Sequence, residues 1–171
     1  QGTYATGTKT LYFLAQDRAN NDSGWTVGSS WTPSLPGGSQ GRPSMVGVSP
    51  LGATAIVQTF TATARDVDGY ADINRVYFLL NTSPSIPAGS CHGYYDRPGN
   101  AVFLYNDALT ALSSPLVLGT TGTIQNGQCA INGAASSVTS SGTDIVLNLN
   151  ITRQGTYATG TKTLYFLAQD R

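Results

Sequence analysis

The sequence contains no glutamate and a single histidine, so the side chains that most often perform acid–base catalysis are scarce. All nine acidic residues are aspartates, and any pair of catalytic carboxylates would have to be two aspartates. His92 follows Cys91, and although Asp96 or Asp107 could orient it, no serine motif of the nucleophile-elbow type accompanies it. One histidine and two cysteines also fall short of a four-ligand zinc set. We therefore expect a protein that is not an enzyme.

Charge is also scarce. Charged residues make up 11% of the chain, and nine basic residues balance nine acidic ones, so nothing attracts nucleic acid or an anionic membrane surface. No stretch of about eighteen apolar residues could insert into a membrane, and the absence of a recognisable secretion signal implies a mature or excerpted chain. Abundant Thr, Ser, Gly, Asn and Tyr are typical of extracellular all-β domains, because turns use Gly, Asn and Ser while strands favour Thr and aromatic residues.

The chain carries one long internal repeat. The segment QGTYATGTKTLYFLAQDR at residues 1–18 recurs unchanged at residues 154–171, an offset of 153 residues. One period is long enough for a single domain with its own core. The repeat therefore predicts an array of domains, and with it an assembly protein.

Most of the chain predicts short β-strands separated by turns. The clearest strand is the stretch 145–152, where Ile145, Leu147, Leu149 and Ile151 form one face. Further strands are expected at 8–16, 25–31, 45–48, 56–64, 73–80, 94–95, 102–105, 116–118, 122–124, 128–131 and 161–169. A segment rich in Pro, Gly and Ser has the composition of a linker. We therefore predict closing strands of a preceding repeat, or a donated strand, over 1–33, a linker over 34–42, and a β-sandwich over 43–171.

The sandwich is expected to end one strand short. Its last strand, 161–169, is the second copy of 8–16, and in the first copy the next strand is 25–31. Residues 1–33 are then either the closing strands of a preceding domain or a segment donated to a neighbouring subunit as an added edge strand. Such pairing would satisfy the open backbone groups of an edge strand and could build a stiff linear polymer.

Two segments, TKTLYFLAQDRANNDSGWTVGSSWTP at 8–33 and TFTATARDVDGYADINRVYFLLN at 59–81, resemble the tandem immunoglobulin-like repeats of large bacterial surface and secreted proteins. In that group a strand ending in Ala-x-Asp is followed by an Asn-rich turn, Ser-Gly-Trp and a final strand. The resemblance implies an immunoglobulin-like (fibronectin III-like) β-sandwich with Greek-key connections, used as a spacer, adhesive or filament-building unit.

Cys91 and Cys129 are the only cysteines and lie 38 residues apart. We expect a disulfide between them, because turn-rich β domains of low charge are typical of oxidising surroundings. Two separate buried thiols are the alternative. The bond would stabilise the fold by about 4 kcal/mol, and it predicts a location outside the cell or at its surface.

Asp66, Asp68 and Asp72 place three carboxylates within seven residues around Gly69. Hard oxygen ligands at this spacing could hold calcium, the one cofactor that the sequence suggests. The segment lacks the later glutamate of an EF-hand loop, and an Asx turn that links two strands is the favoured interpretation.

Asn21, Asn81 and Asn150 each begin an Asn-x-Ser/Thr triplet, the acceptor pattern for N-glycosylation. Such triplets also arise by chance in a chain rich in Asn, Ser and Thr. Asn21 and Asn81 are the favoured candidates because they lie at or beside expected loops.

Five aromatic residues allow two interpretations. They could form a stacking platform for sugars, or they could pack in the core or between domains, which is the commoner use of such residues. The five are Trp25, Trp31, Tyr94, Tyr95 and Tyr105.

These features predict an all-β sandwich that is the structural repeat unit of an extracellular bacterial filament or surface fibre. Copies of the chain, or tandem repeats within one chain, would join head to tail through the repeated strand. The residues of that strand are Leu11, Tyr12, Phe13, Leu14 and Ala15 and, in the second copy, Leu164, Tyr165, Phe166, Leu167 and Ala168. The alternative is a carbohydrate-binding or spacer module of a multidomain secreted adhesin, with a surface polysaccharide as its partner.

Overall fold

The computed structural model describes residues 9–13, 18, 26–31 and 41–171. The chain forms two compact units, Gln1–Gln40 and Gly41–Arg171. The division between them falls within residues 34–42, the stretch whose composition predicts a linker.

The first unit contains a two-stranded antiparallel sheet. Strand β1 (Lys9–Phe13) pairs with β2 (Thr26–Trp31). A two-stranded hairpin alone is marginally stable in water. Four residues singled out by the sequence lie outside the described residues: Leu14, Ala15, Asn21 and Trp25.

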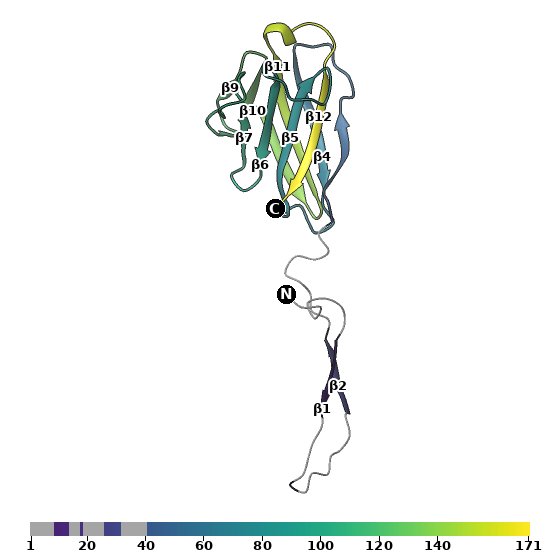
Figure 1. Ribbon diagram of the computed structural model, residues 1–171. Helices are drawn as coiled ribbons and strands as arrows, with labels where there is room; N and C mark the ends of the chain where they lie inside the picture. The colour runs from purple at the N-terminus through teal and green to yellow at the C-terminus, as the bar shows by residue number, and fades with distance from the viewer. Residues whose placement is uncertain (1–8, 14–17, 19–25, 32–40) are drawn as a thin grey trace. The chain divides into compact units, whose positions relative to one another are not determined.

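The second unit is a β-sandwich of two antiparallel five-stranded sheets (Figure 1). The first sheet contains, in spatial order, β3 (Ser44–Ser49), β4 (Val57–Arg65), β11 (Asp144–Arg153), β10 (Cys129–Ser141) and β9 (Thr123–Gln125). The second contains β12 (Thr163–Asp170), β5 (Ile73–Asn81), β6 (Cys91–Asp96), β7 (Ala101–Leu104) and β8 (Leu116–Val117). A 3₁₀ turn, Gly155–Tyr157, precedes β12. The expected all-β sandwich is confirmed.

The two sheets are interleaved along the chain. After β3 and β4 in the first sheet, the chain forms β5 to β8 in the second sheet. It then returns to the first sheet for β9 to β11 and ends with β12 in the second sheet. Neither sheet can therefore form from one continuous stretch of sequence, and the core closes only when distant segments meet.

The core lies between the two sheets. On β11, the alternate residues Ile145, Leu147, Leu149 and Ile151 are at most 1% exposed, so the alternation predicted for this strand is confirmed. Phe78 of β5 is fully buried in the same core cluster. Burial of each such side chain stabilises the fold by about 1.5–3 kcal/mol.

A disulfide bond joins Cys91 at the start of β6 to Cys129 at the start of β10. Because these strands belong to different sheets, the bond ties the two layers of the sandwich together. Both residues are fully buried. The expected pairing is confirmed, and it fits an extracellular or otherwise oxidising environment.

Candidate functional site

The second copy of the repeated strand is β12, and it pairs with β5 of its own unit. Leu164, Phe166 and Ala168 pack against the core from this strand. Tyr165 and Leu167 point to the opposite face because successive side chains of a strand alternate, and Leu167 is 58% exposed. These three residues, expected from the sequence to join neighbouring units, therefore anchor β12 in the sandwich of its own unit.

One edge of β12 is open. β12 is the outermost strand of its sheet, and it contacts β3, the outermost strand of the other sheet (Figure 1). Among the residues that the structure describes, the edge of β12 that faces away from β5 has no partner strand. The backbone N–H and C=O groups along that edge are available to another strand.

An apolar groove of about 660 Å³ lies beside this edge, between the loop that joins β3 to β4 and the first residues of β12. Phe60, Leu80 and Leu164 line it from the core side. Two further lining residues are exposed, Leu51 by 97% and Ile56 by 52%. Exposed apolar surface beside an unpaired strand is typical of an interaction site.

The sequence of β12 has a second partner elsewhere in the chain. Residues 9–13 are identical to residues 162–166, and as β1 they pair with β2. The same segment is thus seen against two different strands, β2 in the first unit and β5 in the second.

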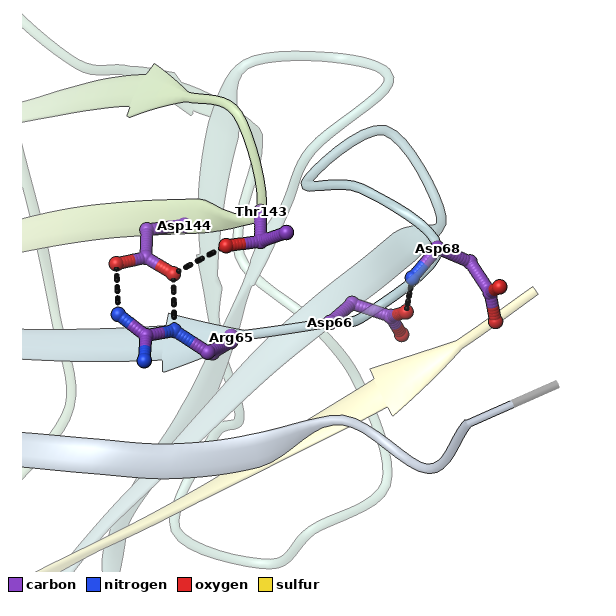
Figure 2. Close-up of polar contacts among 5 residues, drawn as sticks. All are labelled: Arg65, Asp66, Asp68, Thr143 and Asp144. Carbon is purple, nitrogen blue, oxygen red and sulfur yellow. Dashed lines mark hydrogen bonds and ion pairs between the residues drawn. The ribbon is translucent and has the colours of Figure 1, made fainter.

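The turn after β4 gathers three carboxylates. One oxygen each from Asp66, Asp68 and Asp72 lies within 4.8 Å of the other two. The Asp68 N–H donates to Asp66 Oδ1 at 2.7 Å, which is the Asx turn favoured by the sequence (Figure 2). Asp68 Oδ2 accepts the N–H of Gly41 at 3.0 Å. The segment is therefore both an Asx turn and a carboxylate cluster.

Asp170 of β12 is a fourth carboxylate at this place, and sequence analysis did not identify it. It lies opposite Ile73 in the β12–β5 ladder. Burial raises the pKa of its carboxyl, and the neighbouring carboxylates of Asp66, Asp72 and Asp68 raise it further. The sequence signal that could have found it is the Ala-x-Asp end of the repeated segment.

Arg65, which precedes Asp66 in the sequence, already forms an ion pair with Asp144. Arg65 Nε and Nη2 donate to the two carboxylate oxygens of Asp144 at 2.6 and 2.7 Å (Figure 2). Thr143 Oγ1 donates to the same carboxylate at 3.0 Å. The hydrogen bond from Arg65 lowers the pKa of Asp144 to about 2. Because the pair is solvent-exposed, it contributes little to stability.

His92 is a packed residue of the second sheet. Its Nδ1 lies 3.0 Å from the Phe78 carbonyl oxygen, and its ring stacks on that of Tyr105 with 5.1 Å between centroids. Burial lowers the pKa of the imidazole. Asp96 and Asp107, the residues that could have oriented it, accept hydrogen bonds from backbone N–H groups of loops instead.

The aromatic residues considered as a sugar platform are divided between two faces. Tyr94 and Tyr105 lie together, with 6.4 Å between ring centroids, whereas Tyr95 is 2% exposed and belongs to the core. Tyr94 is itself 7% exposed, and the Arg75 guanidinium lies 4.7 Å from its ring centroid. Tyr94 therefore offers no open ring face to a sugar. The side chain of Trp31 lies outside the described residues.

Two of the glycosylation triplets begin at asparagines that take part in the fold. Asn81 is buried, its Nδ2 donates to the Ser85 carbonyl at 3.0 Å, and its Oδ1 accepts the Tyr157 hydroxyl at 3.2 Å. Asn150 Nδ2 donates to Thr59 Oγ1 at 2.9 Å. At both positions the nitrogen that would carry a glycan is a hydrogen-bond donor within the sandwich.

Comparisons of the chain with protein-family models, with curated proteins and with solved structures found no match. Within the described residues, no helix has the length and hydropathy of a membrane span. The repeated strand, the open edge of β12 and the groove beside it are the features that bear most directly on function.

Proposed function

We propose that this chain is the structural repeat unit of an extracellular bacterial filament or surface fibre, in which each immunoglobulin-like sandwich is completed by a strand of a neighbouring unit. The observation that carries the proposal is the repeated segment, which pairs with β2 as β1 and with β5 as β12. Because a strand has two edges, β12 can keep β5 on one edge and take a β2-type strand on the other.

The strand order supports an immunoglobulin-like arrangement. In a constant-type immunoglobulin domain, strands A, B, E and D form one sheet and strands C, F and G form the other. Here β3, β4, β11 and β10 follow one another as A, B, E and D do, and the adjacent β5 and β12 correspond to C and F. The equivalent of strand G would lie on the open edge of β12, which is the place proposed for β2.

The pairing of β1 with β2 sets the register that β2 would adopt on β12. Thr10 lies opposite Ser30 in the first unit, and the copy of Thr10 in β12 is Thr163. Residues directly opposite each other in antiparallel strands lie about 4.5–5.5 Å apart and share one face of the sheet. Ser30 of an incoming strand would therefore lie next to Thr163.

The same register brings an aromatic residue to the groove. Lys9 lies opposite Trp31, and the copy of Lys9 is Lys162, which lines the groove with Leu51. A tryptophan buries roughly 150–250 Å² of surface. Trp31 of the incoming strand would cover the apolar groove beside Lys162, whose ammonium already lies 5.0 Å from the ring centroid of Tyr157.

The exchange of strands favours the completed sandwich. In the exchange, β2 would leave β1 and pair with β12. Residues 9–13 and 162–166 are identical, so the backbone hydrogen bonds that β2 loses are equivalent to those that it gains. The hairpin of β1 and β2 is marginal on its own. The difference between the two states is the apolar groove, which only the completed sandwich covers.

Cross-linking tests this docking. Full-length chain carrying Thr163→Cys is mixed with full-length chain carrying Ser30→Cys and oxidised mildly. We expect a disulfide-linked dimer on a non-reducing gel, because the register places these two residues opposite each other. Thr163→Cys mixed with Thr26→Cys is the control for register, since Thr26 would lie opposite Phe166, and it should cross-link weakly.

Two exposed residues provide matched surface variants. Leu51→Asp, at the groove, should lower the yield of dimer about tenfold, because the variant removes an apolar contact. Val117 lies in β8, at the edge of the second sheet opposite β12, and is 42% exposed. Val117→Asp should therefore leave the yield of dimer unchanged. If Thr163→Cys cross-links equally well to Ser30→Cys and to Thr26→Cys, the proposed docking of β2 is wrong.

The mass of the native polypeptide under denaturing, reducing conditions separates two forms of the fibre. A species near 17.8 kDa means separate subunits joined by strand exchange. A species many times larger means tandem repeats in one covalent chain. A polypeptide of 17.8 kDa that stays monomeric in its native state would overturn the proposed function.

A further inference from the structure

Four carboxylates converge at one end of the second unit. Asp66, Asp68 and Asp72 belong to the turn that follows β4, and Asp170 is the last residue of β12. Asp170 lies opposite Ile73, the residue after Asp72, in the ladder of β12 and β5. The β12–β5 ladder thus brings a carboxylate from a distant part of the sequence to the 66–72 turn.

One of these carboxylates is buried with an oxygen unpaired. Asp66 is 1% exposed, and its Oδ2 has no hydrogen-bond partner among the described residues. Asp170 is half-buried, and its Oδ1 atom also lacks a hydrogen-bond partner there. A buried carboxylate without a partner is strongly unfavourable, and neighbouring negative charges add to that cost. A cation held between the carboxylates would offset this cost.

The described part of the protein does not supply that charge. Its ion pairs join Arg65 to Asp144 and Arg75 to Asp96, so neither includes a member of the cluster. Arg65 precedes Asp66 in the sequence, but its guanidinium is directed at Asp144 (Figure 2).

We propose that Asp66, Asp68, Asp72 and Asp170 bind a calcium ion. Carboxylate oxygens are hard ligands, and calcium takes six to eight oxygens in flexible geometry, with carbonyl groups and water completing the set. Magnesium keeps several waters in a strict octahedron and is usually held by one or two carboxylates rather than by a set of four. Zinc prefers cysteine and histidine, and both cysteines of the chain are in the disulfide.

The ion would join three segments of the second unit. Asp68 Oδ2 accepts the N–H of Gly41, the first residue of that unit. The 66–72 turn, the end of β12 and the segment that leads into β3 would then belong to one network. Calcium would stiffen the unit at this end.

Thermal unfolding of the full chain tests the site, with calcium, magnesium or a chelator present. Extracellular calcium modules bind with a Kd of about 10⁻⁴–10⁻³ M, so about 10 mM calcium should raise the Tm by about 4–8 °C over the chelator-treated protein. Magnesium at the same concentration should give a small part of this shift. Isothermal titration should show saturable calcium binding with the same Kd.

Asp170→Asn separates calcium binding from simple charge repulsion. Without calcium this variant should have a higher Tm than the parent, because the repulsion with Asp66 is relieved. Addition of calcium should not raise the Tm of the variant as it raises that of the parent. Asp107→Asn is the matched control, since Asp107 accepts the N–H of Gly127 in another part of the unit, and it should keep the increment.

One result would overturn the site. If the Tm of the parent chain is the same in calcium and in chelator, and titration shows no binding, no calcium ion is held there. Asp170→Asn would then raise the Tm equally in both conditions.

Discussion

Gly93 lies in the middle of β6, where the aromatic side chains of the second sheet leave no space for a larger residue. A Cβ at this position would collide with the Phe103 carbonyl oxygen and would lie 2.7 Å from Cζ of Phe78. Gly47 of β3 is the opposite case, because no atom lies within 4 Å of the position its Cβ would take. Glycine is thus required sterically at Gly93 and replaceable at Gly47.

Gly93→Ala should lower the free energy of unfolding by about 3 kcal/mol, because β6 or the Phe78 ring has to shift to admit the methyl group. Gly47→Ala should change it by about 0.5 kcal/mol or less. Urea unfolding of the full chain measures both variants. If the two substitutions cost the same, the packing described around Gly93 is wrong.

His92 gives the fold a pH dependence of defined sign. Burial lowers its pKa in the folded state below the ordinary value of 6.5. As the pH falls through about 6.5, the unfolded chain binds a proton that the folded chain does not, so stability is lost on acidification. The loss at a pH of about 5.5 is at most about 1.4 kcal/mol, the full effect of one pH unit. Urea unfolding at pH values of about 7.5 and 5.5 measures it.

His92 is the only histidine in the chain, which makes the control simple. His92→Gln should not lose stability between the pH values of about 7.5 and 5.5. A variant that retains the slope of the parent would assign the pH dependence to another group.

At the scale of secondary structure, the regular strands of the sandwich were predictable and the irregular ones were not. Strand β11 has one face in the core, so its alternation is strong, and the structure agrees with it. For β10 the sequence predicted only 128–131, whereas the strand continues to Ser141. A register irregularity between Asn132 and Ser137 interrupts its ladder with β11, and small residues such as Gly133 fill the interruption. A bulge of this kind removes the alternation on which a sequence prediction depends.

The carboxylate cluster was predictable only as far as local spacing reveals it. Asp66, Asp68 and Asp72 are close in the sequence, so their proximity follows from one turn. Asp170 reaches them through the pairing of β12 with β5, and sequence spacing does not encode that pairing. The groove beside β12 was missed for the same reason, because segments from both sheets line it.

At the scale of the whole molecule, the bond between Cys91 and Cys129 connects the two layers of the sandwich. The double variant Cys91→Ala/Cys129→Ala should lose about 4 kcal/mol of stability, because the loop of 38 residues becomes free in the unfolded state. Urea unfolding with and without reductant measures the effect. The parent in reductant should approach the double variant, and a loss below about 1 kcal/mol would show that the bond is unimportant to stability.

The same bond has a mechanical consequence in the proposed fibre, where each unit would transmit tension. If a unit is pulled open, the chain between the two cysteines cannot extend while the bond is intact. Their separation of 38 residues corresponds to about 130 Å of extended chain. In oxidising surroundings the intact bond keeps this segment from extending when the fibre is stretched. A reductant would break the bond, and each opened unit would then become longer.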